Sequence, residues 1–253
     1  MYKIPANTLF MGHSVVFMPE CHSTNDEASR LIESSGQVLE GTVVITHNQT
    51  SGRGQRGNTW VTEPGKNLTF SLLLRPSFLN AQDQFLLNKC FSLGLYDYLK
   101  STLKATVKIK WPNDMVVNDK KICGILIENQ IQGQNIQHSV VGIGLNVNQE
   151  NFSLPTATSM KMFERNEFSL ENTWAELLGY LEKRYMQLRS GNLEELNSEY
   201  LAALYWMGER HMFKKTAEIF EGTITGIDPY GKLKINVDGT TEYFELKQVQ
   251  FLK

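Results

Sequence analysis

A glycine- and arginine-rich stretch is the first part of the sequence whose residue types point to chemistry. Residues 50–60 (TSGRGQRGNTW) contain three glycines, two arginines and no acidic residue. Glycine lets a backbone approach a ligand closely, and guanidinium and backbone N–H groups bind phosphate or carboxylate. Arg53 and Arg56 therefore indicate an anion site, although a surface loop with solvated arginines is the alternative. The stretch matches neither a Walker A loop nor a dinucleotide fingerprint, since no Gly-Lys-Ser/Thr and no helix is expected after it.

Three further stretches combine polar groups with strand-like sequence. KWPND places Lys110, Asn113 and Asp114 at a strand end. That is a good position for catalytic groups, although an Asx turn would also use the Asn-Asp pair. Lys121 precedes an apolar strand that contains Gly124, so its side chain could reach a bound anion or lie along the strand edge. GIGLNVN has glycines within a strand, which indicates close approach of a ligand or a kink in the sheet.

Together, in this order and at these spacings, the stretches resemble those of the biotin–protein ligase family. The motifs are STND (23–26), GRGQRG (52–57), KWPND (110–114), KICGILIE (121–128) and GIGLNVN (142–148). The combination of KWPND, the GRG loop and a following lysine is specific, and the resemblance covers nearly the whole chain. It implies ATP-dependent activation of biotin to biotinyl-AMP, followed by transfer of biotin to one lysine of a biotin carboxyl carrier domain. It also implies Mg²⁺ with the ATP, although no dedicated carboxylate cage is visible in the sequence.

The resemblance assigns roles to individual residues. Arg53, Lys121 and Asp114 are the expected catalytic residues, with Asp114 near the incoming lysine. The reacting carboxylate and phosphate are both anionic, so positioning and cationic stabilisation should supply most of the rate. The expected biotin-binding residues are Ser23, Thr24, Asn25, Gln49, Gly52, Arg53, Gly54, Gln55, Lys121 and Gly124. The expected ATP or adenylate residues are Arg53, Arg56, Trp60, Lys110, Asn113, Lys121 and Asn146.

Gln55 departs from the family pattern, in which the loop reads GRGR. A glutamine donates hydrogen bonds but brings no charge, and Asn58 stands where a basic residue is frequent. The loop is therefore expected to be less positive than usual. Either Arg56 compensates, or biotinyl-AMP is held more loosely.

Three other functions compete with this interpretation. A lipoate– or octanoate–protein ligase shares the fold and the adenylate chemistry, but the His-Asp pair expected after its glycine-rich motif is missing here. A non-catalytic biotin- or nucleotide-binding protein would tolerate Gln55, but it would not explain Lys110, Asp114 and Lys121 together. A glycoside hydrolase using Asp114 and Glu128 would leave the basic loop unexplained.

The elements that must position these residues are those of an α+β protein. Helices are expected within 21–34, 83–103 and 170–204, the first opened by a capping box of Thr24 and Glu27. Strands dominate the rest of the first half, without regular βα alternation. The resemblance implies a class II synthetase-like catalytic domain with a mixed sheet over residues 1–207, followed by a small SH3-like β-barrel over residues 208–253.

Composition and charge limit the partners and the compartment. The net charge of −2 provides no basic face for non-specific nucleic-acid binding. About twenty residues precede STND, too few for a three-helix DNA-binding unit, so no specific DNA binding is expected. The three cysteines are scattered, and no signal peptide or apolar run of ~18 residues is visible. These features predict a cytoplasmic protein without a membrane segment. The resemblance leaves the oligomeric state open, since family members occur as monomers and as homodimers.

Overall fold

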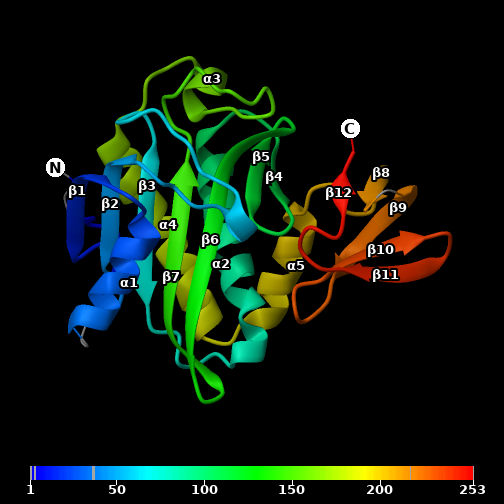
Figure 1. The fold of residues 1–253 in the computed structure, drawn as a ribbon, viewed down its shortest axis with the longest axis horizontal. Coiled ribbons are helices and arrows are strands. Elements are labelled where there is room, and N and C mark those ends of the chain that lie inside the picture. Colours follow the sequence, from blue (N-terminus) through cyan, green and yellow to red (C-terminus); the bar gives the residue numbers. More distant parts are fainter. Residues whose placement is uncertain (1, 3, 36–37, 217, 253) are drawn as a thin grey trace.

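A seven-stranded mixed sheet forms the centre of the molecule (Figure 1). The computed structural model describes residues 2, 4–35, 38–216 and 218–252, apart from the side chains of Ser35 and Arg56. The strands of this sheet are β1 (Val15–Cys21), β2 (Val43–Gln49), β3 (Leu68–Leu74), β4 (Val107–Lys110), β5 (Asp114–Val117), β6 (Lys120–Gln132) and β7 (Asn135–Leu145). Their order is β1-β2-β3-β7-β6-β5-β4, with β1 and β2 parallel and the other described neighbours antiparallel. The predicted mixed α+β fold is confirmed.

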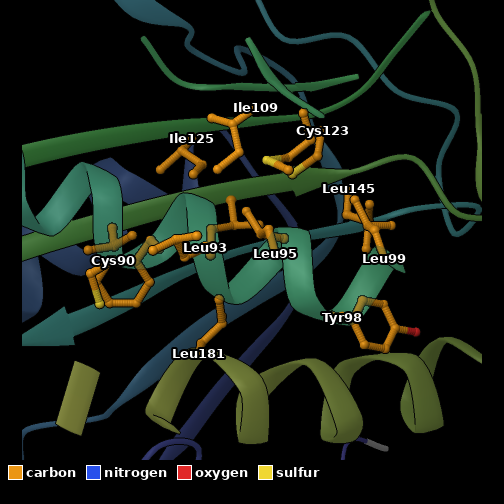
Figure 2. Close-up of a cluster of buried hydrophobic side chains, with 14 of the residues drawn as sticks. Cys90, Leu93, Leu95, Tyr98, Leu99, Ile109, Cys123, Ile125, Leu145 and Leu181 are labelled. Carbon is orange, nitrogen blue, oxygen red and sulfur yellow. The ribbon is translucent and has the colours of Figure 1, made fainter. Parts of the chain in front are cut away.

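Helices cover both faces of this sheet. They are α1 (Thr24–Ser35), α2 (Phe85–Thr102), α3 (Met160–Glu164), α4 (Leu170–Arg189) and α5 (Leu193–Ala203). Figure 2 shows α2 between the sheet and α4, with Leu93 and Leu95 directed at the strands and Leu181 of α4 beneath. The helices expected over 170–204 are α4 and α5, and Gly191 lies between them with a φ of +79°. Within the described residues, no helix has the length and apolar character needed to cross a membrane.

Side-chain alternation along the central strands decides which residues reach the site. Successive residues of a strand point to opposite faces. Phe70 and Leu72 of β3 join the core under α2, whereas Leu73 packs with Ala28 of α1. All seven residues of β3 are buried for this reason. Ser71 therefore shares the α1 face with Leu73. The same alternation places Gly124 and Glu128 of β6, and Gly142 and Gly144 of β7, on this face.

A second sheet of five antiparallel strands follows. Its strands are β8 (Arg210–Lys215), β9 (Glu218–Ile227), β10 (Leu233–Val237), β11 (Thr240–Phe244) and β12 (Gln250–Phe251). Their order, β11-β10-β9-β8-β12, leaves β11 and β12 as the two edges of the described sheet. A closed barrel is therefore not confirmed. The boundary at 207/208 stays a prediction, because one hydrophobic core continues from the large sheet into Phe213, Ile224 and Leu233.

The turn before β10 attaches this second sheet to the body. Gly231 has a φ of +92°, which favours glycine. A Cβ on Gly231 would lie 2.4 Å from the Phe85 ring of α2. The Trp111 indole N–H also donates to the Gly231 carbonyl over 2.8 Å. The predicted motif tryptophan thus holds the C-terminal sheet, and this brings Leu246 and Lys247 to the rim of the site.

Candidate active site

A cavity of about 220 Å³ lies where α1, loop 50–60 and strands β3, β7, β6 and β5 meet. It brings together most of the site residues predicted from the sequence. Those that line it are Ser23, Thr24, Asn25, Gln49, Arg53, Gly54, Gln55, Trp60, Asn113, Asp114, Lys121 and Gly124. Residues about 100 positions apart along the chain thus line one cavity, because α1 packs on the sheet face to which Gly124 of β6 points.

Other predicted residues are not brought to the cavity wall. Asn146 is buried and donates from Nδ2 to the Thr158 carbonyl over 2.9 Å, so its amide holds the chain before α3. Lys110 points to the C-terminal sheet, with Nζ 5.0 Å from the centre of the Phe251 ring. Gly52 packs against loop backbone. The side chain of Arg56 lies outside the described part of the structure.

The glycine-rich loop closes on itself through its backbone. Gly54 N–H donates to the Asn58 carbonyl over 2.7 Å, and Trp60 N–H donates to the Gly52 carbonyl over 2.9 Å. One turn of 3₁₀ helix, Gln55–Gly57, forms the tip. A Cβ on Gly52 would lie 2.3 Å from the Trp60 carbonyl oxygen. Gly52 therefore serves loop closure, and the loop reaches the cavity through the side chains of Arg53, Gln55 and Trp60.

Two of the cations that line the cavity, Arg53 and Lys121, are held by carboxylates. Arg53 Nη2 lies 2.7 Å from Asp26 Oδ1 and 2.8 Å from Glu128 Oε2. Lys121 Nζ lies 2.7 Å from Asp114 Oδ1. A carboxylate or phosphate entering the cavity would compete for these cations, because both are partly exposed. Sequence reasoning missed Asp26 and gave Glu128 no part in this site, although both stand within quoted motifs.

Two glycines make a flat slot that holds the loop tryptophan. Gly124 and Gly144 are cross-strand partners in β6 and β7. A Cβ on Gly144 would lie 2.3 Å from Trp60 Cε2, and one on Gly124 would lie 3.3 Å from Cζ3. Lys121 Nζ lies 5.5 Å from the centre of the Trp60 ring. The sequence predicted a biotin ring against Gly124, but in this structure the indole of Trp60 lies there and forms one wall of the cavity.

A chain of buried polar side chains forms the other end of the cavity. Asn25 Nδ2 donates to Glu128 Oε2 over 2.7 Å, and Asn25 Oδ1 lies 2.6 Å from Ser71 Oγ. Ser71 Oγ lies 2.8 Å from Thr24 Oγ1. The Thr24 backbone N–H donates to Gln49 Oε1 over 2.8 Å. The Thr24 hydroxyl is thus bonded to Ser71 and not to the helix end, so the expected capping box does not describe it.

The direction of these hydrogen bonds follows from the number of protons. Because the Asn25 amide nitrogen faces Glu128, Asn25 Oδ1 accepts and the single Ser71 proton is donated to it. The single Thr24 hydroxyl proton is then used within the protein, because Thr24 Oγ1 lies 2.8 Å from Ser71 Oγ and 3.2 Å from its acceptor Gln49 Oε1. Thr24 Oγ1 therefore offers only lone pairs to a guest, which suits an N–H donor. Sequence reasoning missed Ser71, because a lone serine in the apolar strand LTFSLLL gives no signal of its own.

Substituting Ser71 should weaken binding of a ligand whose uncharged polar group contacts Thr24 and Asn25. In Ser71→Ala the Thr24 and Asn25 side chains lose their fixed orientation, so we expect KM for the bound acid to rise about tenfold, with kcat changed less. Steady-state kinetics would measure this, and melting temperature would report any loss of stability. Ser77→Ala is the matched control, because Ser77 is exposed and follows the end of β3. An unchanged KM in Ser71→Ala would contradict the role given to this chain.

The buried thiol of Cys123, close to Lys121 in the sequence, does not serve as a nucleophile. Burial raises the pKa of the Cys123 thiol well above its ordinary value, although Lys121 acts in the opposite direction. Cys123 is fully buried on the opposite face of β6 and stays protonated. Among the described residues, no three His, Cys, Asp or Glu side chains are grouped in a way that could hold a metal ion. The arrangement suits chemistry between two bound ligands. Lys121 lies at one end of the cavity, and the neutral polar row of Thr24, Asn25, Gln49 and Ser71 lies at the other. Arg53 contacts Glu128 beside this row.

Comparison with known proteins agrees with this geometry. The chain is 27% identical over 231 residues to the bifunctional ligase/repressor BirA of Bacillus spizizenii, covering 89% of this chain and 70% of the relative. It is 29% identical over 218 residues to the biotin–[acetyl-CoA-carboxylase] ligase of Mycobacterium tuberculosis, covering 82% and 78%. The biotin protein ligase of Aquifex aeolicus, solved with biotin and ATP, has the same fold, with a TM-score of 0.78 at 21% identity over 95% of this chain and 99% of that one.

The family itself is identified by a model that matches residues 19–146, a segment running from the end of β1 to the residue after β7. This segment contains the loop, the polar row, Arg53 and Lys121, and it is just over half of the chain. The protein therefore belongs to the biotin/lipoate A/B protein ligase family.

Proposed function

We propose that this protein is an ATP-dependent biotin ligase, which forms biotinyl-AMP and transfers biotin to a lysine of a biotin carboxyl carrier domain. The observation that carries the proposal is the polarity of one cavity. Its polar row lies beside β3, and the ion pair of Lys121 and Asp114 lies on β6 and β5. Two strand spacings separate β3 from β6, which carries Lys121, and three separate β3 from β5, roughly 10 and 14 Å at ~4.8 Å each. Biotin has a neutral urea at one end and a carboxylate at the other, so it fits this division.

The residues would divide the recognition of biotin between them. Thr24 accepts from a ureido N–H, and Asn25 and Gln49 complete a row of donors and acceptors without charge. Arg53 and Lys121 leave their carboxylate partners to bind the biotin carboxylate and the α-phosphate of ATP. Trp60 covers the glycine slot and excludes water from the anhydride. Mg²⁺ would arrive as part of the substrate MgATP.

Two displacements then complete the reaction. A biotin carboxylate oxygen bonds to the α-phosphorus of ATP, the bond to the bridging oxygen breaks, and pyrophosphate leaves. The acceptor lysine, as a neutral amine, next attacks the acyl carbon, and AMP leaves as the amide bond forms. Asp114 lies in the cavity wall and takes one proton from the lysine ammonium before the attack. The second proton, released as the amide forms, leaves with the phosphate of AMP. Arg53 and Lys121 stabilise charge in both transition states, and this is the main contribution expected of the protein.

Several finer predictions rest on the family resemblance and go with this proposal. The five-stranded C-terminal sheet would complete an SH3-like barrel from residue 208 onwards. The carrier-domain partner and the absence of specific DNA binding are also predictions from the resemblance. The resemblance allows either a monomer or a homodimer. The roles given to Gly52, Arg56, Lys110 and Asn146 stay predictions for the ligand-bound protein.

Gln55 should make the intermediate easier to lose than in relatives with arginine there. Its Oε1 is buried in the described structure without a hydrogen-bond partner, and the residue brings no charge to the cavity. In Gln55→Arg we expect release of biotinyl-AMP to slow by about tenfold, because a charge-assisted bond to phosphate is added. Stopped-flow displacement of the intermediate would measure the rate. Gln132→Arg, at the exposed end of β6, is the control, and equal release rates would contradict the expectation.

The complete reaction tests the function. Purified protein, biotin and MgATP should convert a biotin carboxyl carrier domain to the biotinyl form, seen as a mass increase by intact-protein mass spectrometry. The product should be absent without ATP and absent when the target lysine is replaced by arginine. Transfer of lipoate or octanoate in place of biotin would move the protein to the other branch of its family.

A further inference from the structure

A second cavity lies beside the candidate active site, and the mechanism above does not use it. Its volume is about 630 Å³, and it is bounded by β6, the start of α2 and turns of the C-terminal sheet. It shares Gln55, Pro112 and Leu246 with the active-site cavity. The two spaces therefore adjoin at Gln55, on the side where KWPND ends.

The second cavity follows an unpaired edge of β6. Strand β5 begins at Asp114, opposite Gly124, and the Ile125 N–H donates to the Asn113 carbonyl. Beyond Ile125, no described strand of the sheet pairs with β6 on this side. Asn129 stands on that free edge and lines the cavity. A guest lying along the edge would thus point from the outer end of β6 towards Asp114.

The cavity carries two hydrogen-bond acceptors that lack donors. Gln55 Oε1 and Asn129 Oδ1 are buried atoms without a hydrogen-bond partner among the described residues. The Asn129 amide is oriented by its own nitrogen, which donates to Gln84 Oε1 over 3.3 Å. Leaving a buried acceptor unsatisfied lowers stability. A guest rich in N–H donors would recover this cost.

Apolar walls and neutralised charges complete the cavity. Phe85, Trp111 and Ile127 supply apolar surface. The nearby cation Lys232 is paired with Glu245, with Nζ 3.0 Å from Oε1. A lysine side chain combines an apolar stem with an ammonium group that has three donors and no acceptor. Its stem would pack against the rings while its ammonium donates to one amide oxygen and then to the other as the side chain enters.

We propose that the second cavity is the entry channel of the acceptor lysine, with Asn129 and Gln55 as the groups that guide its ammonium towards Asp114. This rests on the proposed biotin ligase function. The lysine enters charged, passes the two carbonyl oxygens and loses a proton at Asp114 before its nitrogen attacks the acyl carbon. Asn129 is a positioning residue in this account, since it contacts the entering substrate before the reaction and takes no part in adenylation.

Measuring adenylation and transfer separately distinguishes a lysine channel from a nucleotide site. In Asn129→Leu we expect KM for a purified biotin carboxyl carrier domain to rise about tenfold. Biotin-dependent ATP–pyrophosphate exchange should keep its rate and its KM for ATP. The neighbouring Gln130→Leu, at an exposed position of the same strand, should change neither reaction. Asn129→Asp adds a negative charge to the channel and should lower KM for the carrier domain at low salt.

The results that would overturn the channel are equally distinct. An unchanged KM for the carrier domain in Asn129→Leu would contradict the proposed entry channel. A raised KM for ATP would also contradict it, because it would indicate that the cavity binds the nucleotide. If the leucine variant fails to fold, Asn129→Asp decides, because an unchanged or raised KM for the carrier domain contradicts an ammonium site. Absence of biotin-dependent exchange in the unaltered protein would overturn the proposed function itself, and the channel with it.

Discussion

Lys121→Gln should lower the rate of biotin-dependent ATP–pyrophosphate exchange by about 10²–10³-fold. Lys121 Nζ is on the cavity wall and 2.7 Å from Asp114. In the proposed reaction it stabilises the charge that builds up when two anions combine. Glutamine keeps a hydrogen-bond donor but removes the charge. The loss should therefore fall on kcat more than on KM for biotin, whose urea is recognised at the far end of the cavity.

The neighbouring lysine provides the control for this variant. Lys120→Gln changes an exposed position on the same strand and should leave the exchange rate within about twofold, because an exposed charge contributes little. The Lys121 variant should also keep its melting temperature within a few degrees, since its ion pair is partly exposed. Near-normal exchange in Lys121→Gln would mean that the cation serves only its pairing with Asp114.

Arg53→Gln should be nearly as damaging, with exchange reduced about 10²-fold. Arg53 is the loop arginine whose side chain the structure places in the cavity wall, and there it bridges Asp26 and Glu128. Removing it deletes a cation that the ligand needs and leaves two carboxylates facing the incoming anions. Binding of biotinyl-AMP should weaken more than binding of biotin, because the adenylate adds a phosphate. Isothermal titration calorimetry with biotin and with a non-hydrolysable analogue of biotinyl-AMP would measure the two losses of affinity.

An arginine outside the cavity separates this effect from a general loss of charge. Arg30→Gln removes an arginine of α1 that pairs with Glu27 on the surface and should leave exchange and binding unchanged. Equal losses in the two variants would indicate that net charge, not the position of Arg53, matters. A loss of biotin affinity equal to that of the adenylate would place Arg53 at the carboxylate alone.

Motif residues could be predicted from the sequence because their chemistry depends on residue type. Lys121 and Asp114 face one cavity as expected, and Thr24 and Asn25 face the same cavity from α1. Ser71 could not be predicted, since its importance arises only when β3 lies under α1 and its hydroxyl contacts both Thr24 and Asn25. Such pairing across the sheet is a property of the folded chain.

The same limit explains the residues that lie elsewhere. Asn146 stands in a glycine-rich motif, but its amide is used by the Thr158 carbonyl within the buried chain. Trp60 was expected at the adenylate, and sequence order could not reveal that its indole lies in the slot of Gly124 and Gly144. The order of the seven strands also depends on long-range pairing, which local sequence patterns do not encode. Tail strands were predicted, but closure into a barrel needs contacts between edges that a list of strands cannot supply.

The measurement that tests the central claim most directly is ATP–pyrophosphate exchange with biotin, lipoate and octanoate supplied in turn. The polar row at Thr24 and the cations at Arg53 and Lys121 predict exchange with biotin and none with the two acids that lack a urea. Exchange only with lipoate or octanoate would contradict the role of the polar row. No exchange with any acid, in a protein that still binds biotin, would contradict the adenylation chemistry and leave a binding protein whose cations hold the ligand without activating it.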